Sequence, residues 1–90
     1  MDEAVKNDLP ETQISDTSLV AFLALKGHQV KPWVNRESGQ VEFTVRGNLQ
    51  TDEEAFYNNE SVGIQDFCRK LKEIKSAMYN LKKTIKERYE

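Results

Sequence analysis

Cysteine and histidine are almost absent from this sequence, with Cys68 and His28 as the only examples. A single cysteine excludes an internal disulfide or a CxxC pair and agrees with a reducing compartment. A metal or nucleophile site needs several clustered ligands or catalytic groups, and the chain also lacks a P-loop and a dinucleotide fingerprint. The sequence therefore predicts a protein that is not an enzyme and uses no cofactor and no metal.

Long apolar runs are also missing. The longest, residues 19–25, has seven members, whereas a membrane-spanning helix needs about 20. The first residues have neither the basic nor the apolar region of a signal peptide. We therefore expect a cytoplasmic protein with no membrane partner.

The charge is unevenly distributed along the chain. Residues 1–62 hold five Lys and Arg against eleven Asp and Glu, whereas residues 63–90 hold eight against four. Residues 1–15 are acidic and polar with no apolar period, so we expect a disordered acidic tail there. Residues 16–90 are expected to form a single domain.

Two kinds of periodicity follow the tail. Asp16 is placed to cap an apolar helix over residues 17–26, which Gly27 would end. Residues 41–46 alternate in polarity and predict a half-buried strand, paired with residues 28–34 across a turn at residues 35–39. Pro32 lacks an N–H group, so its strand should lie at an edge of the sheet. His28, just after the helix, is expected to contact backbone carbonyls rather than to act in catalysis.

Two further helices are predicted. Thr51 and Glu54 have the spacing of a capping box, which opens a short helix that ends at Asn58 and Asn59. Residues 63–90 then carry apolar side chains at alternating spacings of three and four, which predicts one long amphipathic helix. The expected fold is α+β, in the order α-β-β-α-α, with an antiparallel hairpin packed by helices.

The long helix is expected to extend beyond the globule. Its 28 positions span about 42 Å, whereas a domain of this size has a radius of gyration of about 12 Å. Its far turns then need a second copy or a partner to cover them, and we predict a homodimer interface at Met78, Leu81 and Ile85. Cys68 lies beside the apolar seam and is interpreted as a small hydrophobic residue.

Four segments of the chain resemble a known family. They are TSLVAFLALKGH at residues 17–28, VEFTV at residues 41–45, FYNN at residues 56–59, and LKEIKSAMY at residues 71–79 with Phe67 before it. The chain is similar over these residues to a family of small bacterial and phage-borne domains of unknown function. The resemblance implies a compact α+β domain and no established activity. Family members often carry Gly where this chain has Asn59.

The hairpin suggests a binding function. If the apolar residues of strand 41–46 face the core, Lys31 and Trp33 lie on the opposite face with Thr44 and Arg46. Cations around an exposed indole are typical of proteins that bind single-stranded nucleic acid, DNA or RNA. Two placements of Trp33 stay open, on this face or in the core. The predicted nucleic-acid-binding residues are Lys31, Trp33, Arg36, Thr44, Arg46, Lys72 and Lys75.

The alternative function is a protein-interaction or regulatory adaptor, such as a phage-type effector. It would act through the apolar seam of the long helix, which could bind a protein partner instead of a second copy. The two hypotheses predict different surfaces. Nucleic acid would contact the hairpin face and the basic helix, whereas a protein partner would contact Leu81 and Ile85.

Overall fold

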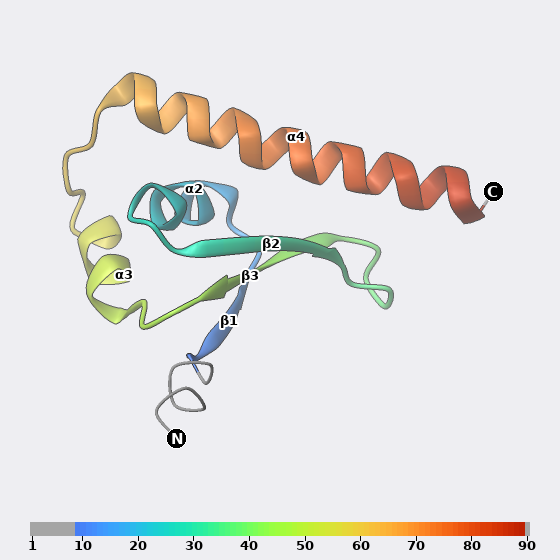
Figure 1. Ribbon diagram of the computed structural model, residues 1–90, viewed down its shortest axis with the longest axis horizontal. Coiled ribbons are helices and arrows are strands. Elements are labelled where there is room, and N and C mark those ends of the chain that lie inside the picture. The colour runs from blue at the N-terminus through green and yellow to red at the C-terminus, as the bar shows by residue number, and fades with distance from the viewer. Residues whose placement is uncertain (1–8, 90) are drawn as a thin grey trace.

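The computed structural model describes the backbone of residues 9–89 and the side chains of residues 9–84. Within these residues, three strands and three helices follow one another in the order β-α-β-β-α-α (Figure 1). They are β1 (Glu11–Ile14), α2 (Thr17–Leu25), β2 (Gln29–Val34), β3 (Val41–Arg46), α3 (Gln50–Tyr57) and α4 (Ile64–Tyr89). The predicted α+β class is confirmed, but the predicted order omitted β1.

All strands pair in one antiparallel sheet in the order β1-β3-β2. The predicted hairpin is confirmed, and β2 with Pro32 forms an edge of the sheet, as expected. β1 forms the other edge, where Ile14 pairs with Phe43 and Glu11 with Arg46. Residues 11–14 are thus a strand and not part of a disordered tail, whereas residues 1–8 of the predicted tail lie outside the described residues.

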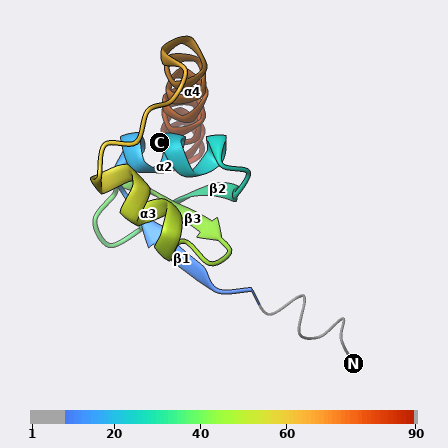
Figure 2. The ribbon, with the colours of Figure 1, turned by 90° about the vertical axis from the view of Figure 1, so that its left-hand side faces the viewer.

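One face of the sheet forms the floor of the core. Val41, Phe43 and Val45 of β3 are buried, together with Ile14 of β1. Helix α2 packs above them, and α4 packs on α2 and on the hairpin. Figure 2, which views α4 nearly end-on, shows α2 beneath α4 and the strands beneath α2. Both of these helices therefore lie on the core side of the sheet.

Helix α2 begins and ends where the sequence predicts. The Asp16 carboxylate accepts hydrogen bonds from the backbone N–H groups of Ser18 and Leu19, at 2.9 and 3.4 Å. Gly27 has a φ of 98°, and its N–H and that of His28 donate back to carbonyls of the last turn. This pairing is a Schellman motif, which needs a left-handed residue at the glycine position.

Helix α3 begins earlier than the predicted capping box. Leu49 occupies the N-cap position, and no side chain caps the helix there. Thr51 therefore lies inside the helix rather than before it, and the capping box does not form. Asn59, past the end of α3, has a φ of 61°, a left-handed conformation that Asn adopts more readily than most residues other than Gly.

Helix α4 packs on the domain along much of its length. Ile74 is buried, and the residues packed against the same core include Met78 and Leu81. The last turns of α4 extend past the turn between β2 and β3 (Figure 1). The core thus supports α4 as far as Leu81, and that a partner covers the turns beyond it stays a prediction.

Candidate nucleic-acid interface

The face of the sheet opposite the core is polar, and no described helix packs on it. Because side chains alternate along a strand, this face receives the residues that lie between the buried ones. We call it the polar face. It consists of Glu11 and Gln13 from β1, Gln29, Lys31 and Trp33 from β2, and Glu42, Thr44 and Arg46 from β3.

Trp33 lies across this face rather than in the core. Its indole Nε1 donates a hydrogen bond of 2.7 Å to Oε1 of Gln13. Since Trp33 is on β2 and Gln13 on β1, with β3 between them, the indole ring must extend over β3. Trp33 is half-buried, so part of the side chain stays open to solvent. Of the two placements that the sequence left open, the structure shows the one on the polar face.

A second hydrogen bond fixes the acceptor that holds the indole. The hydroxyl of Thr44, which pairs with Gln13 in the sheet, donates to the same Oε1 atom at 2.8 Å. One side chain from each strand therefore takes part in a single contact. We call Gln13, Trp33 and Thr44 the indole clasp. Gln13 was not among the predicted site residues. Its role depends on strand β1, which the sequence did not predict.

Lys31 lies beside the indole clasp. It pairs with Thr44 in the sheet and is exposed. A hollow of about 460 Å³ opens next to it, lined by Glu11, Gln29, Val30, Lys31, Thr44 and Arg46. Its lysine and arginine can contact an anion that enters the hollow from the polar face.

Acidic side chains offset part of the positive charge of the polar face. Glu11 lies directly across from Arg46, and Glu42 directly across from Trp33. One oxygen of Glu42 accepts a hydrogen bond of 3.1 Å from the side-chain amide of Asn35. The polar face therefore carries both positive and negative charges, and its net charge gives little attraction to a polyanion. Any such attraction comes locally, from Lys31 and from Arg36 in the adjoining turn.

The remaining predicted nucleic-acid-binding residues lie elsewhere. Arg36 is exposed in the turn between β2 and β3. Lys72 and Lys75 are exposed on α4, which lies on the core side of the sheet. The structure therefore brings together Lys31, Trp33, Thr44 and Arg46 but separates Lys72 and Lys75 from them.

Two residues of the predicted dimer interface pack on their own chain. Met78 and Leu81 are half-buried against the core of their own chain, so the argument that they need a second copy to cover them does not hold. The side chain of Ile85 lies outside the described residues. The homodimer itself stays a prediction.

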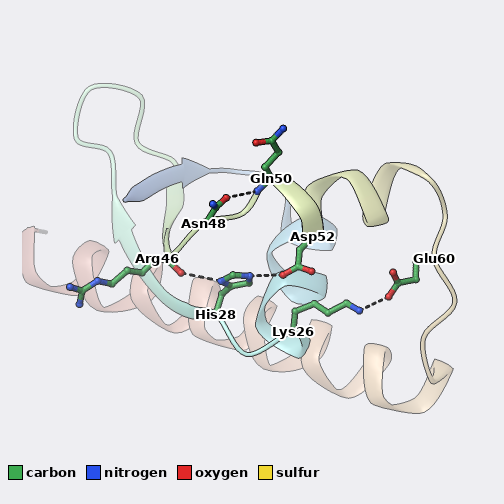
Figure 3. Close-up of polar contacts among 7 residues, drawn as sticks. All are labelled: Lys26, His28, Arg46, Asn48, Gln50, Asp52 and Glu60. Carbon is green, nitrogen blue, oxygen red and sulfur yellow. Dashed lines mark hydrogen bonds and ion pairs between the residues drawn. The ribbon is translucent and has the colours of Figure 1, made fainter. Parts of the chain in front are cut away.

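His28 links three segments of the fold (Figure 3). Its Nε2 atom lies 2.7 Å from Oδ2 of Asp52, and its Nδ1 atom lies 3.2 Å from the carbonyl oxygen of Arg46. Both ring nitrogens therefore face hydrogen-bond acceptors of the same chain. The contacted carbonyl belongs to β3, not to the end of α2 as predicted.

The backbone beside His28 is shaped to admit the ring. Gly47 has a φ of 118°, and a Cβ atom there would lie 2.9 Å from Nδ1 of His28. An ion pair nearby joins Lys26 to Glu60 (Figure 3), and the hydrogen bond that Lys26 donates to the Glu60 carboxylate raises the pKa of Lys26. Together these contacts fix α3 to the end of α2 and the sheet.

The other chemical groups form no cluster. Among the described residues, no three His, Cys, Asp or Glu side chains are placed to hold a metal ion. Cys68 is exposed and does not contribute to the core as the sequence suggested. No described helix combines the length and the apolar composition that a membrane span requires.

Comparisons with known proteins leave the family open. No protein-family model, no curated protein and no solved structure matches this chain. The resemblance noted from the sequence therefore stays a prediction, and the case for a function rests on the geometry of the polar face.

Proposed function

We propose that this domain is a small non-enzymatic binding module that holds single-stranded nucleic acid on the polar face of its sheet. The observation that carries the proposal is the indole clasp, in which Trp33 donates to Gln13 across β3. The clasp holds the indole over β3, and Trp33 stays partly exposed. An aromatic ring held in place on the surface of a sheet is what an unpaired base stacks on.

Fixing the ring before binding favours affinity. An aromatic side chain that must be ordered on binding loses rotamer freedom, which costs about 0.5–1.5 kcal/mol. The hydrogen bond to Gln13 already restricts the ring of Trp33 in the free protein. Base stacking on such a ring contributes about 1–3 kcal/mol, so little of that gain is offset by ordering.

Phosphate contacts would come from the cations around the clasp. Lys31 is exposed beside the ring, and Arg36 lies in the turn that follows β2. Each neutralised phosphate of a single strand releases counterions and contributes about −0.7 to the slope of log K against log salt. With Glu11 and Glu42 on the same face, we expect a shallow slope, equivalent to two or three phosphates at about this value each.

The test combines binding and folding in one variant. Trp33→Ala should weaken binding of a labelled single-stranded oligonucleotide by about 1–3 kcal/mol, measured by fluorescence anisotropy at low salt. Its free energy of unfolding in urea should fall by no more than about 1.5 kcal/mol, the net value of one hydrogen bond. A tryptophan in the core would instead cost about 3–5 kcal/mol of stability.

A matched control separates stacking on Trp33 from loss of any exposed ring. Tyr57 is 70 % exposed on α3, away from the sheet, so Tyr57→Ala should leave oligonucleotide binding unchanged. The proposal fails if the wild type binds no single-stranded DNA or RNA at low salt. It also fails if Trp33→Ala and Tyr57→Ala bind equally well.

A protein-interaction adaptor is the second candidate, favoured by apolar residues around the α3–α4 connection. Tyr57, Val62 and Ile64 are 70 %, 38 % and 73 % exposed. They lie beside a hollow of about 160 Å³ that includes Phe22, Phe56 and Phe67 in its lining. If nucleic acid does not bind, Ile64→Asp should disrupt a complex with a protein partner, whereas Trp33→Ala should not.

A further inference from the structure

Helix α4 carries a second pattern next to its core-facing residues. The residues that face the core are Phe67, Leu71, Ile74, Met78 and Leu81. The residue that follows each of them is Cys68, Lys72, Lys75, Tyr79 and Lys82. Positions three and four apart share one side of a helix, so this second set forms its own line. Lys83 lies beside Tyr79, four positions further along the helix. We call Lys72, Lys75, Tyr79, Lys82 and Lys83 the lysine flank.

The acidic residues of α4 whose side chains the structure describes lie on the opposite flank. Asp66 and Glu73 each precede a core-facing residue, and each is paired with a cation on its own side. Arg69 contacts Asp66 at 3.1 Å, and Lys70 contacts Glu73 at 3.1 Å. The positive charges of that flank are therefore largely compensated where they lie.

The lysine flank has no such compensation among the described residues. Lys72, Lys75, Lys82 and Lys83 are all exposed, and none forms an ion pair with a described side chain. Tyr79 stands among them, 69 % exposed. A hollow of about 500 Å³ runs along this side, lined by Lys72, Lys75, Ser76, Met78, Tyr79 and Asn80.

The geometry points to the phosphate backbone of double-stranded nucleic acid as the ligand of the lysine flank. Lys72 and Lys82 lie ten positions apart, about 15 Å along the helix axis. A strand of duplex DNA carries one negative charge per about 3.4 Å. The duplex therefore offers a regular row of anions long enough for every lysine of the flank.

A lipid surface fits the flank less well. Helices that lie on membranes insert a free apolar face between the lipids. The apolar face of α4 is already occupied, because Ile74 is buried and Met78 and Leu81 pack on the core. This surface is also distinct from the polar face, since α4 lies on the core side of the sheet, and it does not depend on base stacking by Trp33.

The experiment compares two double variants, each of which removes two positive charges from α4. Lys72→Gln/Lys75→Gln removes two cations from the lysine flank, and Arg69→Gln/Lys70→Gln removes two from the compensated flank of the same helix. Binding of a labelled 20-base-pair duplex is measured by anisotropy across a salt series, and thermal unfolding by circular dichroism checks that both variants fold. A fluorophore on Cys68, one turn before Lys72 and the only cysteine, reports whether the duplex reaches this flank.

The proposal predicts weaker duplex binding for Lys72→Gln/Lys75→Gln alone. Its slope of log K against log salt should become shallower by about 1.8, at about 0.9 per lost phosphate contact. Arg69→Gln/Lys70→Gln and Trp33→Ala should bind duplex like the wild type, and the Cys68 fluorophore should respond on binding.

Three results would overturn it. Equal loss in both double variants would indicate a general charge effect, and loss in Trp33→Ala would place the duplex on the polar face. Absence of duplex binding, with binding to polyglutamate or to vesicles of anionic lipid instead, would assign the flank to an acidic protein or a membrane. Failure of single-strand binding at Trp33 would leave the duplex result unaffected.

Discussion

The two faces of the sheet use the same strands for different purposes. On β3, Phe43 is fully buried and its neighbour Thr44 is half-exposed. On β1, Ile14 is buried while Gln13 is exposed. The core face is covered by α2 and α4, whereas on the polar face the indole of Trp33 extends over β3 and no described helix packs there. A single alternating sequence thus separates the residues that fold the domain from those available to bind.

This difference has an energetic consequence. Burial of large apolar side chains provides most of the free energy of folding. An exposed hydrogen bond contributes little net stability, because water replaces it when the chain unfolds. The polar face can therefore change with a small effect on folding.

The largest expected effect contrasts neighbours on opposite faces. Phe43→Ala should lower the free energy of unfolding by about 3–5 kcal/mol, because it leaves a cavity beneath α2. Thr44→Ala, which removes the hydroxyl that donates to Gln13, should cost only about 0.5–1.5 kcal/mol. Urea denaturation followed by circular dichroism measures both. Similar losses in the two variants would show that the faces do not differ as described.

The next effect tests whether β1 belongs to the core face. Ile14→Ala should cost about 2–5 kcal/mol of stability, because this side chain is buried among the residues of the core. Glu11→Ala, on the same strand but exposed, should stay within about 0.5 kcal/mol of the wild type. If Ile14→Ala unfolds at the urea concentration of the wild type, β1 contributes nothing to the fold.

A smaller effect is expected at the polar contact that joins the residue before β2 to β3 and α3. His28→Ala leaves the half-buried carboxylate of Asp52 without its partner, which should cost about 1–3 kcal/mol. Glu54→Ala, exposed on the same helix, provides the control and should be neutral. Thermal melting distinguishes them. A neutral His28→Ala would mean that apolar contacts alone hold α3 in place.

The smallest effect concerns how the indole is held. Gln13→Ala removes the acceptor of Trp33 and should cost about 0.5–1.5 kcal/mol of stability. Single-strand binding should also weaken, but less than in Trp33→Ala, since the ring remains and only its fixed orientation is lost. Gln29→Ala, another exposed glutamine of the polar face, is the matched variant. If Gln13→Ala binds like Gln29→Ala, the clasp does not prepare the ring for binding.

Local signals in the sequence predicted most of the fold. The Asp16 cap, the Gly27 stop and the edge position of Pro32 all follow from chemistry within a few residues, and all are confirmed. The alternation of residues 41–46 also predicted a half-buried strand, and its apolar residues are indeed buried, whereas the placement of Trp33 stayed open. These features depend on interactions between residues that are close together in the sequence, so the sequence alone is enough to predict them.

The features that the sequence did not reveal depend on contacts between distant segments. β1 has one buried apolar residue, Ile14, and becomes a strand only because β3 offers it a partner. Gln13 cannot be assigned to the clasp until β1 is placed beside β3. In the sequence, Asp52 looks like an ordinary acidic residue in the first turn of a helix, because its partner His28 is 24 residues away. Each of these needs the tertiary arrangement first.

The most direct measurement uses Trp33 itself, the only tryptophan in the chain. Titration with a single-stranded oligonucleotide should quench its fluorescence in a saturable manner, because a base stacks on the exposed part of the ring, and added salt should reverse the quenching. Anisotropy of the labelled oligonucleotide gives the bound fraction in the same samples. Fluorescence that stays constant while the oligonucleotide binds, or an absence of binding at low salt, would contradict the account.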